Sequence, residues 1–450
     1  MSASTLWYPH PQAASMSSLR QTNVLASPIM NHSQPRKHSS TCFFRKLLHH
    51  YNEVDQEKLM THSQFLTQDL KEAVRKRDWQ IDEVFLINTL EKLLNCPSPS
   101  GMTDDVVNVT SAILEDLGIE YELTRRGAIR ATLRGKKYSP DRAVVAHLDT
   151  LGAIVKNVKA NGRLALAPIG HWSSRFAEGA RVCVHADHNL YKGTILPLKA
   201  SGHSYNEEID RQPSNWDQVE IRLDEISHDL ADLERLGINI GDMVTVNAQP
   251  EFHDNGFICS RHLDDKAGVA AILAAAKAIL EGGFTLPLEC HLLFTISEEV
   301  GVGASHVLHG DVAEMVSVDN GTNSPVQNSS NYGVTIALQD MTGPFDRHLS
   351  HKLISLARTF GIEHERDVFR YYRSDAAAAL EAGNDIRTAL ICFACDGSHG
   401  WEQSHISSLV AVSDLLVAYL RSPLLFERDE FAIGPKDDFP SGEDKPDADQ

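Results

Sequence analysis

The segment FTISEEVGVG, from Phe294 to Gly303, joins an apolar run to two adjacent carboxylates. The run is typical of a buried strand, and Glu298 and Glu299 follow at the point where that strand should end. Like charges that lie side by side repel each other unless positive groups lie close by. The segment therefore predicts a cation-binding site at the mouth of a sheet.

The same arrangement recurs along the chain. Strand-like runs alternate with helix patterns such as the Ala-rich residues 266–283, which predicts an α/β fold with a mixed sheet flanked by helices. Four runs end in metal-ligand types: VVAHLD in His147 and Asp149, LFTISEE in Glu298 and Glu299, MVSVD in Asp319, and ICFACDGSH in His399. Asp264 and Asp265 precede the Ala-rich helix. Ligands of open α/β sheets bind beyond the carboxyl ends of strands, so we expect these residues to converge.

Each of these residues also has a purely structural explanation. Asp264 or Asp265 could cap the helix, His147 could be a core histidine, and Asp319 could begin a turn. The glutamate pair could be a solvated strand end. Because all five groups occupy the same kind of boundary, we favour a shared metal site.

Two divalent ions about 3.5–4 Å apart need a bridging carboxylate and a mixture of histidine and carboxylate ligands. His147 and Asp149 alternate along a strand, so we expect them to share one face, with His147 on metal and Asp149 supporting it. Glu299 can coordinate while Glu298 takes a proton from water activated by the metals.

Residues 155–256 interrupt the α/β pattern with short strand-like pieces and polar turns, which predicts an inserted small β-rich domain. The catalytic domain would then consist of residues 80–154 and 257–425. Residues 1–79 are expected to form a disordered or helical N-terminal extension, and residues 426–450 an acidic disordered tail. A helix over residues 408–420 is expected to be capped by Ser407 or Ser408.

Composition limits the function classes. A formal net charge of -19 over 450 residues argues against nucleic acid or an anionic membrane as partner. The apolar runs fall short of the ~18 residues that a membrane span requires. Seven cysteines, an odd number with several in strand-like runs, favour a reducing compartment, so we expect a cytoplasmic protein. Cys392 and Cys395 form a CxxC within an apolar run, which favours core packing over a metal or redox role.

The stretches AHLDTLGAIV, HLDDKAGVAAIL, ISEEVGVGAS and SVDNGT resemble the tetrahedral aminopeptidases, which include deblocking and glutamyl aminopeptidases. The resemblance covers about residues 80–422 and implies a zinc-peptidase core with a PDZ-like dimerisation insert. It also implies dimers that assemble into a tetrahedral dodecamer. Two metals are implied, with zinc expected and cobalt or manganese also compatible. The implied roles are His147 and Asp319 on one metal, Glu299 and a late histidine on the other, Asp264 as bridge, Glu298 as general base, and Asp149 orienting His147.

The chain departs from the family pattern near its last ligand. The stretch DGSHGWEQSHISSL lacks the usual proline and offers two histidines, of which we prefer His399, with His405 as the alternative. This variant resembles the subgroup that accompanies synthesis of the osmoprotectant N-acetylglutaminylglutamine amide. Asp375, in RSDAAAAL, is a candidate substrate-binding residue, although it could instead cap a helix.

The leading hypothesis is a metallo-aminopeptidase that acts on short peptides or peptide-like amides. A deacylase or amidohydrolase that trims an N-acylated dipeptide amide would use the same site on another bond. A non-catalytic assembly protein is a third hypothesis, but it predicts loss of the base or a ligand, and the sequence retains His147, both glutamates and both aspartates.

Overall fold

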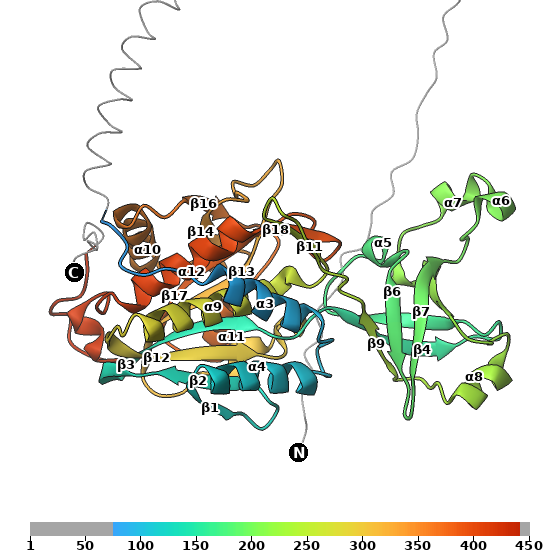
Figure 1. The fold of residues 1–450 in the computed structure, drawn as a ribbon, viewed down its shortest axis with the longest axis horizontal. Coiled ribbons are helices and arrows are strands. Elements are labelled where there is room, and N and C mark those ends of the chain that lie inside the picture. The colour runs from blue at the N-terminus through green and yellow to red at the C-terminus, as the bar shows by residue number, and fades with distance from the viewer. Residues whose placement is uncertain (1–74, 442–450) are drawn as a thin grey trace, which may run out of the picture. The chain divides into compact units, whose positions relative to one another are not determined.

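The computed structural model describes residues 75–441, and within them nine strands form the main sheet (Figure 1). Four neighbouring strands at its centre run parallel to one another. In sheet order they are β12 (Leu286–Thr295), β3 (Gly135–His147), β13 (Val312–Thr322) and β17 (Arg387–Cys395). The flanking strands, mostly antiparallel, are β1 (Glu120–Leu123), β2 (Ile129–Leu133), β14 (Val334–Asp340), β15 (Gly343–Pro344) and β16 (His364–Val368). The predicted mixed α/β sheet is confirmed.

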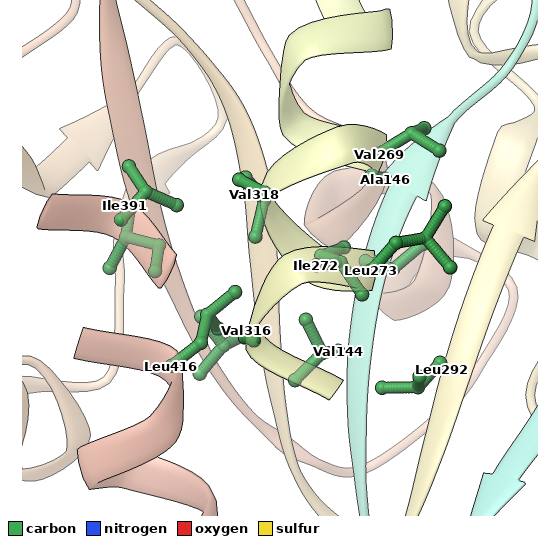
Figure 2. Packing of buried hydrophobic residues seen from close by; sticks show 14 of the residues in the cluster. Val144, Ala146, Val269, Ile272, Leu273, Leu292, Val316, Val318, Ile391 and Leu416 are labelled. Carbon is green, nitrogen blue, oxygen red and sulfur yellow. The ribbon is translucent and has the colours of Figure 1, made fainter. Parts of the chain in front are cut away.

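Helices cover this sheet because its central strands are apolar on both faces, as parallel strands usually are. Figure 2 shows Val144 and Ala146 of β3 packed near Ile272 and Leu273 of helix α9. The core-domain helices are α3 (Glu83–Leu94), α4 (Asp104–Asp116), α9 (Leu263–Glu281), α10 (Arg347–Thr359), α11 (Asp375–Glu381) and α12 (Ile406–Leu420). Helix α9 contacts the sheet, α3 and α12, which explains why it is apolar nearly all round.

The predicted serine cap of α12 is wrong. His405 is the N-cap residue, and its Nδ1 accepts a hydrogen bond from the backbone N–H of Ser407 at 3.1 Å. The Ser408 hydroxyl is buried and is used between strands instead: it accepts from the N–H of Ala394 and donates to the carbonyl of Gly333. A tertiary contact therefore outweighs the local capping preference of serine.

The inserted segment closes into a barrel of six strands within the described residues. Its strands are β4 (Gly152–Val158), β5 (Leu164–Ile169), β6 (Arg181–His185), β7 (Leu190–Pro197), β8 (Val219–Leu223) and β9 (Met243–Val246). Short helices lie between them: α5 (Ser174–Ala177), α6 (Gly202–Tyr205), α7 (Glu208–Arg211), α8 (Leu230–Leu236) and the 3₁₀ turn η1 (Trp216–Gln218). The barrel has its own apolar core, and it begins at Gly152, slightly before the expected residue 155.

A small sheet marks the return of the chain to the core domain. It consists of β10 (Glu251–Phe252), β11 (Phe257–Ser260) and β18 (Glu402–His405). Because β11 pairs with β18, the exit of the insert is joined to the segment that follows β17. Three further 3₁₀ turns are η2 (Glu298–Val300), η3 (Gly303–His306) and η4 (Glu427–Glu430).

Both ends of the described chain contact the core domain beyond the expected boundaries. Trp79 donates a hydrogen bond from Nε1 to Asp414 on α12 at 2.9 Å. In η4, Asp429 accepts from Arg387 Nε at 2.5 Å, so the start of the expected tail is packed. The rest of the predicted extension and tail, residues 1–74 and 442–450, lies outside the described residues. None of the helices in the described range is long and apolar enough to cross a membrane.

A buried ion pair joins the sheet to α12. Arg142 and Glu314, on adjacent strands, are 1% and 0% exposed, and Arg142 Nη2 lies 3.0 Å from Glu314 Oε2. Tyr419 of α12 donates its hydroxyl to the same carboxylate at 2.9 Å, and its backbone carbonyl accepts from Arg142. Burial raises the pKa of Glu314, but the charges of Arg142 and Lys352, together with the hydrogen bonds that the carboxylate accepts, lower the pKa overall.

We expect Glu314→Gln to lower the free energy of unfolding by about 3–5 kcal/mol, because it leaves Arg142 buried without its counter-charge. Urea unfolding followed by circular dichroism measures this. The matched control is Glu122→Gln, which removes a 67% exposed partner of Arg130 and should cost less than about 1 kcal/mol. Equal losses in both variants would contradict the importance of the buried pair.

Candidate functional site

The candidate site lies where the four parallel strands end (Figure 1). His147 is the last residue of β3, and Glu298 and Glu299 begin η2, which follows the end of β12 after two residues. Asp319 is near the end of β13, and His399 follows β17. Asp264 stands at the start of α9 with non-helical backbone angles, so the regular helix begins only after the Asp264–Asp265 pair. Residues far apart in sequence thus meet at one edge of the sheet.

Two groups of ligand atoms share Asp264. His147, Asp264 and Asp319 form one group, and Asp264, Glu299 and His399 form the other, each with its ligand atoms within 4.8 Å of one another. His147 Nε2 lies 3.1 Å from Asp264 Oδ1, whereas His399 Nε2 lies 3.2 Å from Asp264 Oδ2. The two oxygens of one carboxylate therefore face the two groups separately, which is the arrangement of a bridging ligand.

Both histidines are held with Nε2 toward the carboxylates. His147 Nδ1 donates to the backbone carbonyl of Asp149 at 2.9 Å, and His399 Nδ1 donates to the backbone carbonyl of His171 at 2.9 Å. A carbonyl can only accept, so the proton resides on Nδ1 and the Nε2 lone pair is available in the neutral ring. Metal-binding histidines are typically oriented in this way.

Asp149 holds the turn that carries the glutamates. Its carboxylate accepts from the backbone N–H of Glu298 at 3.0 Å, from that of Glu299 at 3.3 Å, and from the Ser100 hydroxyl at 2.5 Å. β3 ends at His147, so the expectation that Asp149 shares a strand face with His147 is wrong. Asp149 contacts the histidine mainly through its backbone carbonyl, while its carboxylate Oδ1 lies 3.7 Å from His147 Nδ1.

Glu298 lies beside the two groups but belongs to neither. Its Oε2 is 3.8 Å from His147 Nε2, and its side chain is 14% exposed. Burial raises its pKa well above the usual value; the charge of His147 opposes this, and nearby Asp319 and Asp375 add to it. The residue thus has the burial and position of a proton-transfer group.

Glu402 is a buried residue that the sequence analysis did not single out. Its carboxylate accepts from the backbone N–H of His399 at 2.8 Å and from that of Asp264 at 3.2 Å. It therefore holds the backbones of His399 and Asp264, two members of the second ligand group, close to each other. In the stretch DGSHGWEQSHISSL, the signal that could have found it is its position three residues after the preferred histidine.

Asn320 was also missed, and it follows Asp319 directly in sequence. Its side-chain amide donates to Asp264 Oδ2 at 2.6 Å and to Asp319 Oδ1 at 3.2 Å. It therefore links the shared carboxylate of Asp264 to Asp319 of the first group.

The remaining candidates lie in different places. His405 is outside the site: it caps α12, and its Nε2 faces the carbonyl of Asn255. Asp375 is buried, and its carboxylate accepts from Thr295 Oγ1 and from the N–H of Ala304, both at 2.6 Å. Ser374, not Asp375, caps α11, so the capping alternative is wrong. Cys392 and Cys395 are fully buried in β17 and belong to none of the candidate metal-binding groups of the described residues.

The site concentrates buried negative charge. Burial and the charge of Asp264 raise the pKa of Glu299 to about 8, although His399 opposes this. For His399, burial lowers the pKa, but the hydrogen bond with Asp264 and the negative charges of Glu299, Asp264 and Glu402 together raise it to about 10. Among residues 75–441, the ion pairs that Asp264, Glu298 and Glu299 form are with histidines. Buried acidic groups in such excess are stabilised by cations, and the donor set of imidazole nitrogens and carboxylate oxygens suits divalent ions such as zinc.

Comparisons with known proteins identify the family. The family described as M42 glutamyl aminopeptidase matches residues 127–415. The YhfE protein of Bacillus subtilis (strain 168), named as a candidate aminopeptidase, is 37% identical over 337 residues, which cover 75% of this chain and 97% of that protein.

Two solved structures share the fold. One is the TET aminopeptidase of the marine sediment archaeon Thaumarchaeota archaeon SCGC AB-539-E09, with a TM-score of 0.68 at 18% identity over 75% of this chain and 96% of that one. The other is the Pyrococcus horikoshii TET1 peptidase, with a TM-score of 0.64 at 21% identity over 74% of this chain and 99% of that one. With the family match spanning well over half of its length, the chain belongs to the M42 glutamyl aminopeptidase family and is a peptidase, a hydrolase of peptide bonds.

Proposed function

We propose that this chain is an aminopeptidase that uses two divalent metal ions, zinc by preference, to hydrolyse short peptides or peptide-like amides. The observation that carries the proposal is the pair of ligand groups that share Asp264, with Glu298 beside them and outside both. His147 and Asp319 would hold one ion, and Glu299 and His399 the other.

When bound, two such ions lower the pKa of water and polarise the carbonyl of the scissile bond. Glu298 acts as the general base: its carboxylate takes the proton of the attacking water and then passes it to the leaving amine. Asp149 keeps this carboxylate in place by accepting the N–H of Glu298. Asp375 remains a proposed substrate-side residue, and its bonds to Thr295 and Ala304 hold it rigidly at the start of α11.

We expect Glu298→Gln to retain both metals and to lose about 10²–10⁴-fold in kcat/KM, because the amide cannot accept the proton. Metal content is measured by plasma mass spectrometry alongside hydrolysis of short peptides. The control is Glu91→Gln, which makes the same change at an exposed position on α3 and should remain fully active. A Glu298→Gln enzyme with unchanged activity would show that Glu298 is not the base, and absence of metal from the wild type would overturn the two-metal proposal.

The bond that is cleaved needs its own test. Hydrolysis of matched peptides with a free or an N-acetylated amino terminus is expected to favour the free amine. Preference for the acetylated series would instead support a deacylase or amidohydrolase on N-acylated dipeptide amides, as the resemblance to the osmoprotectant subgroup suggests.

We also propose that the chain assembles through its barrel into dimers and then a dodecamer. The Pyrococcus horikoshii relative is described as assembling into a tetrahedron or an octahedral shell. Apolar side chains at the barrel surface are more than half exposed, among them Leu190, Ile226 and Ile240. A dimer interface formed by the barrel would bury such side chains.

Light scattering coupled to size-exclusion chromatography is expected to give a large oligomer for the wild type and smaller species for the double variant Ile226→Glu, Ile240→Glu. The control, Val326→Glu, changes an 86% exposed residue of the core domain and should leave the assembly intact. A monomeric wild type, or an intact double variant, would contradict assembly through this surface.

A further inference from the structure

Another cluster of side chains that could bind a metal ion lies in the main sheet, apart from the candidate active site. Asp141 of β3 and Glu289 and His291 of β12 each offer one ligand atom, and these atoms lie within 4.8 Å of one another. The two strands are neighbours, with His291 paired to Ala143. The register shifts between Leu288 and Cys290, which places Glu289 at an irregularity in the strand.

The cluster is remote from the two ligand groups around Asp264. Asp141 precedes His147 by six residues in the same strand. A strand rises about 3.3 Å per residue, so the two positions are roughly 20 Å apart along β3. The cluster lies toward the amino ends of the parallel strands, whereas the candidate active site lies at their carboxyl ends.

Each of the three residues has a buried polar atom without a hydrogen-bond partner in the described part of the chain. These atoms are Asp141 Oδ1, Glu289 Oε2 and His291 Nδ1. Asp141 and His291 are each only 4% exposed. Buried polar atoms are normally paired, and a cation bound by these three residues would supply a partner that the cluster lacks.

The other polar atoms of the cluster hold it in shape. Asp141 Oδ2 accepts from the backbone N–H of Asp311 at 3.0 Å and lies 3.3 Å from His291 Nε2. The ring of His309 packs against that of His291, with centroids 4.1 Å apart and the ring planes tilted by 40°. Gly310 has φ of +71°, and a Cβ there would lie 2.2 Å from Asp141 Oδ2. Residues 309–311 therefore pack directly onto the cluster.

We propose that Asp141, Glu289 and His291 bind one divalent transition-metal ion, separate from the candidate active site, and that this ion fastens residues 309–311 to β3 and β12. One imidazole nitrogen with two carboxylate oxygens suits zinc, cobalt or manganese. Calcium and magnesium are disfavoured because they prefer all-oxygen sites. Solvent would complete the coordination at the partly exposed side of Glu289.

The test compares full-length wild type with Glu289→Gln after saturation with Zn²⁺ and removal of loosely bound metal. We expect plasma mass spectrometry to give about one ion per chain fewer for the variant, because a carboxylate ligand has been replaced by a weaker amide. Added Zn²⁺ should also raise the melting temperature of the wild type more than that of the variant. Glu91→Gln is the matched control: it makes the same change at an exposed position on α3, outside the cluster, and should bind metal like the wild type.

Equal metal content in wild type and Glu289→Gln would overturn the proposal and would mean that His291 simply contacts Asp141 without a metal ion. Anomalous diffraction at the zinc edge from wild-type crystals needs no variant. It should show a peak among the three residues, and peaks confined to the Asp264 region would also overturn the proposal. Because the comparison is a difference of one ion, it is independent of how many ions the active site holds.

Discussion

The Asp149 carboxylate accepts hydrogen bonds from the backbone N–H groups of Glu298 and Glu299. This acidic side chain therefore fixes the conformation of the turn that contains both glutamates. With the turn held at its backbone, the glutamate side chains leave it in different directions, and only Glu299 joins a ligand group. The carbonyl of Asp149 holds His147 at the same time. The end of β3, the turn after β12 and the imidazole between them are thus positioned by a single residue. If Asp149 were displaced, both the proposed base and a proposed ligand would move with it.

The barrel contributes a backbone hydrogen-bond acceptor to the candidate site. His399 comes from the core domain, yet the carbonyl that orients its ring belongs to His171 of the insert. Nearby, Arg261 donates to the carbonyl of Phe176, also in the insert, and Trp172 donates its indole N–H to the carbonyl of Gly152. The insert therefore contributes backbone groups rather than ligand side chains. The exposed side chain of His171 belongs to neither ligand group, but the backbone carbonyl of this residue orients the ring of His399.

Local patterns in the sequence predict much of this architecture, because the buried strands are short apolar runs and the residues at their ends are unusual for solvated turns. The convergence of His147, Asp264, Glu299, Asp319 and His399 follows from the parallel order of the strands. Features that depend on distant contacts were not predictable in the same way. Glu402 accepts a hydrogen bond from the backbone N–H of Asp264, which is 138 positions away in sequence. Ser408 does not cap α12 because its hydroxyl is hydrogen-bonded to the backbone of Gly333 and Ala394. The cluster of Asp141 with His291 depends on the shifted register of β12, which periodicity does not reveal.

The sequence of the barrel is inserted between His147 and Asp264. These two residues are 117 positions apart in sequence, yet His147 Nε2 lies 3.1 Å from Asp264 Oδ1. Closing so long a loop has an entropic cost that grows with the logarithm of its length. In the barrel, however, the first strand pairs with the last, and Ala153 lies opposite Val244. Once that pairing has formed, the two points where the chain crosses back to the core domain are already neighbours, and only short connecting segments remain free. Folding of the insert would thus account for most of the entropic cost of closing this loop, before the ligand residues of the candidate site come together.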